Sequence, residues 1–147
     1  MRILILLLVV GLIWPVSLSA SATLPLIESE DLDGTFHWRY IELPEVETAK
    51  EHAMVAFKNF FEYGQYCVPT DVEVLTITLN NGHLILNVSK EIWEYGGSAF
   101  EIALVEQLLK IASTVPEVSE FTLKIEGIVQ PLVQGLELDR VCVWARL

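Results

Sequence analysis

The chain has 147 residues, with nine basic residues against 20 acidic ones and a formal net charge of −11. This length predicts one domain, and the 52% hydrophobic content excludes an intrinsically disordered protein. The acidic balance excludes a nucleic-acid-binding protein, because phosphates require a basic surface. Two cysteines are too few for a disulfide-dense small scaffold.

Residues 1–22 have the pattern of a secretory signal peptide. A basic residue precedes an unbroken apolar run over residues 3–10, and Pro15 interrupts the apolar segment before it reaches the length of a membrane span. The sequence Ala-Ser-Ala ends at Ala22 and is typical of a cleavage site. We therefore predict cleavage after Ala22 and export to the cell envelope or the medium, with no stable membrane span in the mature protein. An uncleaved membrane anchor is the alternative.

Residues 23–34 are rich in acids and lack an apolar period, which predicts a solvated acidic linker before the folded domain. The acidic residues are Glu28, Glu30, Asp31 and Asp33. A calcium-binding loop is the alternative, but the acids do not follow the alternate spacing with a closing glutamate that such loops require. A single folded domain is therefore predicted to span residues 35–147.

The order of apolar patterns in this domain predicts the fold. Alternating residues indicate strands, and apolar residues recurring every three or four positions indicate helices. In chain order, the patterns predict a strand at 35–43, a helix at 45–63, strands at 72–79 and 83–88, a helix from 98 to about 115, and a strand at 119–126. Residues 141–144 are a candidate edge strand. The order β-α-β-β-α-β predicts an α+β two-layer sandwich, with both helices packed on one face of a small mixed sheet.

Local signals define the ends of these elements. Asn80, Asn81 and Gly82 predict a turn in which glycine takes a positive φ, so that the two flanking strands form a hairpin. Ser98 and Glu101 match a capping box, in which the hydroxyl accepts from a backbone amide and the carboxylate reaches back to the cap.

The sequence contains no recognised motif for catalysis, metal binding or cofactor binding. Three histidines lie on different predicted elements, without a second ligand at metal spacing: His37, His52 and His83. Gly96 and Gly97 precede a helix N-terminus, but they lack the glycine fingerprint and the lysine of a phosphate loop. We therefore expect a protein that is not an enzyme and that binds no metal or cofactor.

The two cysteines, Cys67 and Cys142, admit three interpretations. In an exported chain, a Cys67–Cys142 disulfide is the first, and a pair of small buried hydrophobic side chains is the second. The third is a nucleophilic Cys67 thiol paired with a histidine, either His52 or His83.

An aromatic pair beside two acids is the best candidate for a carbohydrate contact. Trp93 and Tyr95 lie next to Glu91 and Glu94 in the sequence. Nearby, Asn87 begins a formal glycosylation sequon at the end of a predicted strand, which is a weak signal.

Several motifs occur in order between Leu75 and Gly127. They start in the hairpin around the turn, continue in the sequence Asn-Val-Ser-Lys-Glu-Ile, and end in the strand before Gly127. The motif residues are Gly82, Asn87, Ser89, Gly96, Gly97, Ser98 and Glu101. This segment resembles the GerMN domain, a family named from sporulation and spore germination proteins and also found in bacterial envelope lipoproteins. The middle motif is similar to the family pattern V-(N/D)-F-S-(K/S)-E-F.

The resemblance implies a non-enzymatic envelope domain in which the motif residues are structural. Residues 36–63 have the family's order of elements but no motif. Val88 stands where the family has an aromatic residue, and the sequence after Gly127 matches poorly. One domain copy fits, and no cysteine lies near the cleavage site. These departures argue against a lipid-tethered, tandem-domain mode of action.

From the resemblance we expect an exported, non-catalytic module for protein interaction or assembly in the bacterial cell envelope, acting in sporulation or spore germination. The partner would be another envelope protein or a second copy of the chain, bound through a sheet edge or an exposed helix face. A module that binds peptidoglycan through Trp93 and Tyr95 is the alternative.

Overall fold

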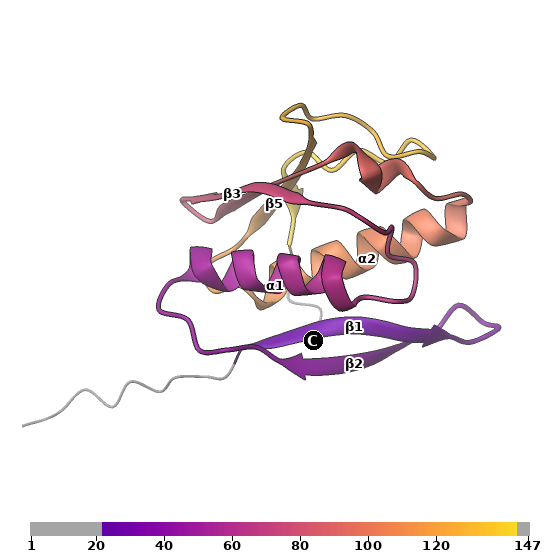
Figure 1. Ribbon diagram of the computed structural model, residues 1–147, viewed down its shortest axis with the longest axis horizontal. Coiled ribbons are helices and arrows are strands. Elements are labelled where there is room, and N and C mark those ends of the chain that lie inside the picture. The colour runs from indigo at the N-terminus through magenta and orange to yellow at the C-terminus, as the bar shows by residue number, and fades with distance from the viewer. Residues whose placement is uncertain (1–21, 144–147) are drawn as a thin grey trace, which may run out of the picture.

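The computed structural model describes residues 22–143 (Figure 1). The predicted signal peptide up to residue 21 and Trp144 of the candidate edge strand lie outside the described residues. The elements are β1 (Thr23–Glu30), β2 (Phe36–Glu42), α1 (Ala49–Tyr63), β3 (Val74–Asn80), β4 (His83–Val88), a 3-10 helix η1 (Lys90–Trp93), α2 (Ser98–Thr114), β5 (Glu120–Ile125) and β6 (Val141–Cys142). The predicted α+β class with two helices and a mixed sheet is confirmed.

Two helices lie between two β-sheets (Figure 1). One sheet is the antiparallel hairpin β1–β2. The other has the order β3-β4-β5-β6, in which β4 and β5 are parallel and the remaining pairs are antiparallel. α2 is part of the crossover that parallel strands require. The structure therefore adds a second sheet to the predicted two-layer sandwich, and this sheet covers the other side of the helices.

The additional strand β1 occupies most of the predicted acidic linker, so the linker prediction is wrong for residues 23–30. Leu24, Leu26 and Ile27 are buried, and β1 pairs with β2 along its length. The acids begin at Glu28, and they lie in the exposed end of the strand and in the hairpin turn. Pro25 obscures the strand pattern in the sequence, because proline is unusual within a strand, although here it is buried between two core leucines.

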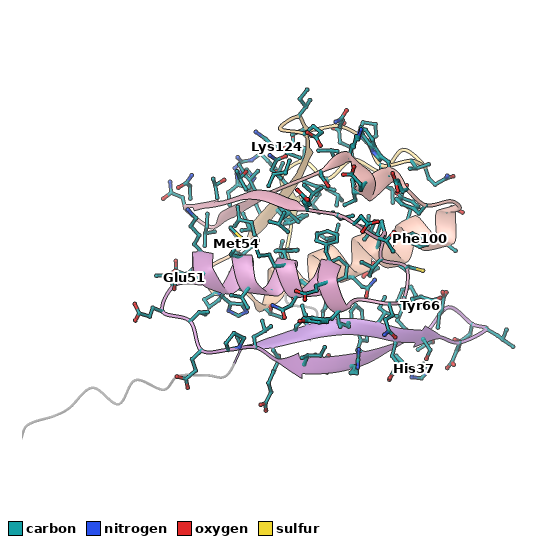
Figure 2. The ribbon with its side chains drawn as sticks, in the orientation of Figure 1. His37, Glu51, Met54, Tyr66, Phe100 and Lys124 are labelled. Carbon is teal, nitrogen blue, oxygen red and sulfur yellow. The ribbon has the colours of Figure 1, made fainter. Side chains whose placement is uncertain are left out.

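A capping box defines the start of α1, four residues later than the predicted start at Glu45. The hydroxyl of Thr48 accepts from Glu51 N at 3.2 Å. In return, the carboxylate of Glu51, which lies at the N-terminal end of α1 in Figure 2, accepts from Thr48 N at 3.1 Å. Since these bonds satisfy backbone groups that a helix start leaves free, they fix where the helix begins.

The predicted turn between β3 and β4 is confirmed. Asn81 and Gly82 have positive φ angles of 50° and 78°, as a two-residue hairpin turn requires. Gly82 also lies close to the start of β5, because a Cβ atom there would come within 2.9 Å of Glu117 O. Its carbonyl accepts from Ser119 N at 2.8 Å. Glycine is therefore needed both for the turn and for the close approach.

The main core lies between the helices and the four-stranded sheet. Phe57 of α1 stacks on Phe121 of β5, with ring centroids 5.9 Å apart. Alternate strand residues face this core and are buried, namely Leu84, Leu86, Val88, Phe121, Leu123 and Ile125. The alternation of apolar residues in the sequences of β4 and β5 therefore corresponds to burial of one face of the sheet.

A buried amide connects the hairpin sheet to the helices. Gln107 of α2 accepts through Oε1 from Ile27 N of β1 at 2.9 Å. Its Nε2 donates to Tyr66 O, in the loop after α1, at 3.0 Å. The side chain has 0% exposure, so water cannot replace either hydrogen bond. One side chain thus links β1, α2 and the loop after α1.

Gln107→Met should lower the free energy of unfolding by about 2–4 kcal/mol, because methionine keeps the volume but leaves Ile27 N and Tyr66 O buried without partners. Chemical denaturation followed by circular dichroism measures the change. Gln65→Met is the matched control, since Gln65 is exposed in the adjacent loop, and should change stability by less than about 0.5 kcal/mol. Equal stability of the two variants would contradict a structural role for Gln107.

Candidate functional site

β3 forms an open edge of the four-stranded sheet. It is the outermost strand, and within residues 22–143 no strand pairs with its other side. Its sequence, Val-Leu-Thr-Ile-Thr-Leu-Asn, contains neither a charged residue nor a proline. Leu75 is 41% exposed, and Thr76 and Thr78 are exposed as well. Sheet edges are normally protected by charges, prolines or bulges. β3 has a register irregularity between Val74 and Thr76, but from Thr76 to its end the edge has none of these protections.

The hairpin register determines which backbone groups of β3 point outward. Asn80 and His83 flank the two-residue turn and therefore form a hydrogen-bonded pair. Hydrogen-bonded pairs alternate along an antiparallel ladder, so Ile77 and Leu79 direct their N–H and C=O groups to the open side. The ladder is regular from Thr76 to the turn. An extended segment can therefore pair with this part of β3.

The other edges are better protected. Beside β5 the chain returns as an irregular segment, in which Leu138 O accepts from Leu123 N at 2.8 Å and Ile128 O accepts from Ile125 N at 2.8 Å. The two-residue strand β6 continues this cover. In the hairpin sheet, β2 has exposed polar or charged side chains at His37, Arg39 and Glu42.

A groove of about 760 Å³ opens at the start of β3. It is lined by α1, by the loop after α1 and by the first residue of β3. The apolar lining includes Phe61, Val68, Val72 and Val74, and the charged lining consists of Lys58, Glu62, Asp71 and Glu73. Because the groove reaches β3, it is continuous with the open strand. The groove and the edge together are called the β3 site below.

The three histidines have separate surroundings. His37 Nε2 lies 2.8 Å from Asp31 Oδ2 near the tip of the hairpin sheet (Figure 2). His83 Nε2 lies 2.8 Å from Thr122 Oγ1. His52 is buried, with 7% exposure, and its Nε2 has no hydrogen-bond partner in the described part of the chain. Within residues 22–143, no three histidine, cysteine or acidic side chains lie together in a way that could hold a metal.

Both cysteines are free in the structure, so the Cys67–Cys142 disulfide is not formed. Cys67 is half-buried in the loop after α1, and burial raises the pKa of its thiol. Cys142 is exposed in β6, opposite Glu120 of β5. The raised pKa disfavours the thiolate that a cysteine nucleophile needs.

Trp93 and Tyr95 make internal contacts and do not form an open aromatic platform. Trp93 Nε1 donates to Pro131 O at 3.2 Å. Tyr95 stacks on Phe100, with ring centroids 4.6 Å apart, and its hydroxyl donates to Glu101 Oε2 at 2.6 Å. Burial and this hydrogen bond raise the pKa of Tyr95. Both rings are half-buried, so they offer a glycan less surface than two fully exposed rings would.

Glu101 is a buried anchor for the C-terminal loop, and its predicted role in a capping box with Ser98 is wrong. The N-cap of α2 is Gly97, and no side chain caps it. Glu101 has 0% exposure and accepts from Gln134 N at 2.6 Å and from Leu136 N at 3.0 Å, in addition to Tyr95. These bonds compensate the carboxylate for its removal from water. The role is not visible in the sequence, because two of the three donors are backbone amides.

Other motif residues also have structural contacts. Asn87 Oδ1 accepts from Gly127 N at 2.8 Å, and Ser89 Oγ accepts from Glu73 N at 2.9 Å. Asn87 Oδ1 and Ser89 Oγ of the glycosylation sequon therefore both accept hydrogen bonds from backbone amides within the fold. Gly97 has a φ of 92°, a conformation that favours glycine before the helix.

The arrangement of elements is that of GerMN domains. The first GerMN domain of the sporulation protein GerM from Bacillus subtilis is similar, with a TM-score of 0.59 and 19% identity over 84% of this chain and 97% of that one. The tandem GerMN domains of the same protein give the same TM-score and identity, over 84% of this chain and 46% of the tandem chain. A candidate lipoprotein from Clostridium perfringens has a TM-score of 0.55 and 13% identity, over 78% of this chain and 79% of that one. No protein-family model and no curated protein matches the sequence.

The chain therefore has the fold of a single GerMN domain, which confirms the resemblance that the motifs indicate at the level of fold. It spans about half of the tandem structure, as one of two domains would. Within residues 22–143, no helix is long and apolar enough to cross a membrane.

His52 should make the fold sensitive to mild acid. Burial lowers the pKa of His52 from its ordinary value of 6.5, so the folded state favours the neutral imidazole while the unfolded chain takes up a proton first. Stability is therefore full above that ordinary value and falls as the pH drops through the lowered pKa of the folded state. His52→Leu removes the titrating group, and thermal melts between about pH 7.5 and 5 should then show a flatter profile.

The control is His37→Gln. His37 is exposed and lies beside Asp31, so this variant should keep the acid sensitivity of the native protein. If His52→Leu loses stability with falling pH as steeply as the native protein does, His52 is not the source of the effect.

The thiols provide a separate test. Without reductant, the purified exported protein should contain two free thiols per chain after denaturation, measured with DTNB. In the native state Cys142 should react first, because it is exposed, and Cys67 should react slowly, because burial raises its thiol pKa. Cys142→Ser should remove the fast phase alone. A chain without free thiols would instead show that the two cysteines pair.

Proposed function

We propose that this protein is an exported, non-catalytic module that acts by protein–protein interaction in the cell envelope, with β3 as its docking strand. The observation that carries the proposal is the uncharged and unpaired edge of β3, which is regular from Thr76 to the turn. The fold supports it, since similar structures include a domain of a sporulation protein and a candidate lipoprotein. A role in sporulation or spore germination is part of the proposal.

Strand addition fits the geometry of this edge. A partner segment in an extended conformation would pair with the outward N–H and C=O groups of Ile77 and Leu79 and lengthen the sheet by one strand. Its main chain would supply affinity, and its alternate side chains would supply specificity. The exposed Thr76 and Thr78 favour such pairing, because β-branched side chains suit a pleated surface.

A different protein is a better partner than a second copy of the chain. The formal net charge of −11 makes two copies repel each other, most strongly at low salt. Self-association through two β3 edges is the alternative outcome of the test below.

A non-catalytic role agrees with the placement of the reactive side chains. His37, His52 and His83 lie on β2, α1 and β4, and each has its own surroundings. Cys67 is in a loop, with its thiol pKa raised by burial. Export is supported by the signal-peptide pattern and by the start of β1 at Thr23, directly after the predicted cleavage site.

The decisive comparison is between Leu79→Pro and Leu79→Ala. Both shorten a half-buried side chain, but only proline removes the outward N–H of residue 79, and an open edge tolerates that loss. In-cell crosslinking of the tagged full chain, followed by mass spectrometry, should recover one reproducible envelope protein with the native chain and with Leu79→Ala. Leu79→Pro should lose it, while circular dichroism shows a folded protein.

Two results would contradict the proposal. Equal recovery of the partner by both folded variants would show that β3 is not the docking strand. Recovery of peptidoglycan fragments without a protein partner would favour the cell-wall alternative, and Trp93→Ala would then test the predicted glycan contact.

A further inference from the structure

We propose that the segment which pairs with β3 carries an arginine or lysine whose side chain enters the groove at the start of β3. The inference rests on the proposed function, because it takes strand addition at β3 as given. It adds the chemistry of one partner residue and the site that recognises it.

The position of the groove makes it accessible to an added strand. Side chains of a strand alternate between the two faces of its sheet, so every second residue of the partner would point to the side where α1 packs. The groove lies on that side, since α1 supplies Lys58, Phe61 and Glu62 to its lining and β3 supplies Val74. An inward side chain of the partner would therefore enter it.

The lining suits a side chain with an apolar stem and a polar end. Phe61, Val68 and Val72 provide apolar contacts, and charged residues share the same lining. Arginine and lysine combine a long hydrocarbon stem with a cationic head and commonly bury the former while exposing the latter.

The groove lining has more acidic than basic side chains, so it would attract a cation. The groove lining contains three acids, Glu62, Asp71 and Glu73, and one base, Lys58. The ion pairs His37–Asp31 and Arg140–Glu120 lie elsewhere, and neither involves a residue of the groove lining. Asp71 and Glu73 are exposed. A basic side chain would supply the missing positive charge.

The other acidic cluster of the molecule differs from the groove. At the tip of the hairpin sheet, Asp31 lies beside His37, and Glu30 accepts from the hydroxyl of Tyr66 at 2.7 Å (Figure 2). Asp33 accepts from Thr35 N at 3.0 Å. Those acids have internal partners. In the groove, Glu62 is hydrogen-bonded to Tyr63, whereas Asp71 and Glu73 are exposed and lie beside an apolar lining.

The probes are three blocked heptapeptides of the form acetyl-Thr-Val-Thr-X-Thr-Val-Thr-amide, with arginine, glutamine or glutamate at X. Valine and X share one face of such a strand, and threonine occupies the other. Fluorescence anisotropy with the full mature chain should give the tightest binding for arginine and the weakest for glutamate. Glutamine should bind roughly fivefold more weakly than arginine, the size expected for two partly exposed ion pairs. Amide shifts of Ile77 and Leu79 in NMR spectra should report the pairing.

Asp71→Asn combined with Glu73→Gln should reduce binding of the arginine peptide roughly fivefold and leave the glutamine peptide unchanged. Asn is a suitable replacement, because Asp71 has a φ of 60° and asparagine tolerates this conformation. The matched control is Glu28→Gln combined with Glu45→Gln, which removes the same charge at exposed positions outside the groove. It should bind all three peptides as the native chain does.

The outcomes separate the two proposals. If arginine and glutamine peptides bind equally well, and Leu79→Pro abolishes both, strand docking stands and the basic residue is refuted. An equal loss in the groove variant and in the control would refute the groove as well, because net charge alone would then explain the preference. If no peptide binds, or if Leu79→Pro binds as Leu79→Ala does, docking at β3 fails and the inference fails with it.

Discussion

The amide of Gln107 joins the hairpin sheet to α2 and to the loop after α1, and the position of the hairpin depends on this link. A two-stranded hairpin is marginal in water unless it packs on something else. Here Leu24 and Leu26 of β1 bury their side chains with the helices, and Gln107 takes up the free amide of Ile27. Its second bond holds the loop after α1 through Tyr66 O. The hairpin, α2 and the wall of the groove are therefore positioned by one side chain.

This arrangement determines which surfaces remain for binding. With a sheet on each side, the helices are largely covered, and Ile102 is the large apolar residue that α2 leaves exposed. The C-terminal segment covers β5, and Glu101 fastens its loop to α2. The open edge of β3 therefore remains as a result of how the rest is packed, and the loop that Gln107 holds forms one side of the groove beside it.

Much of this fold can be predicted from the sequence, and the failures have physical causes. Alternation predicts β4 and β5, because each buries one face, and it also predicts β2, where Phe36 and Trp38 are half-buried. The sequence does not predict β1, since the apolar residues of this strand flank a proline and its other half is acidic. The sequence predicts a capping box at Ser98 and Glu101, whereas the structure has one at Thr48 and Glu51 of α1. Spacing alone cannot distinguish the two sites. The carboxylate of Glu51 is bound to the helix cap, whereas that of Glu101 is bound by residues of other segments.

The β3 site was beyond prediction for a related reason. A pattern of residues shows that a strand exists, but its place in the sheet depends on contacts distant in sequence. Still, the uncharged sequence of β3 is informative once the topology is known. In a chain with a formal charge of −11, seven successive uncharged residues at an open edge create a risk of unwanted pairing. The irregular cover on β5 shows that the same sheet can protect an edge, so the open state of β3 agrees best with a strand kept available for a partner.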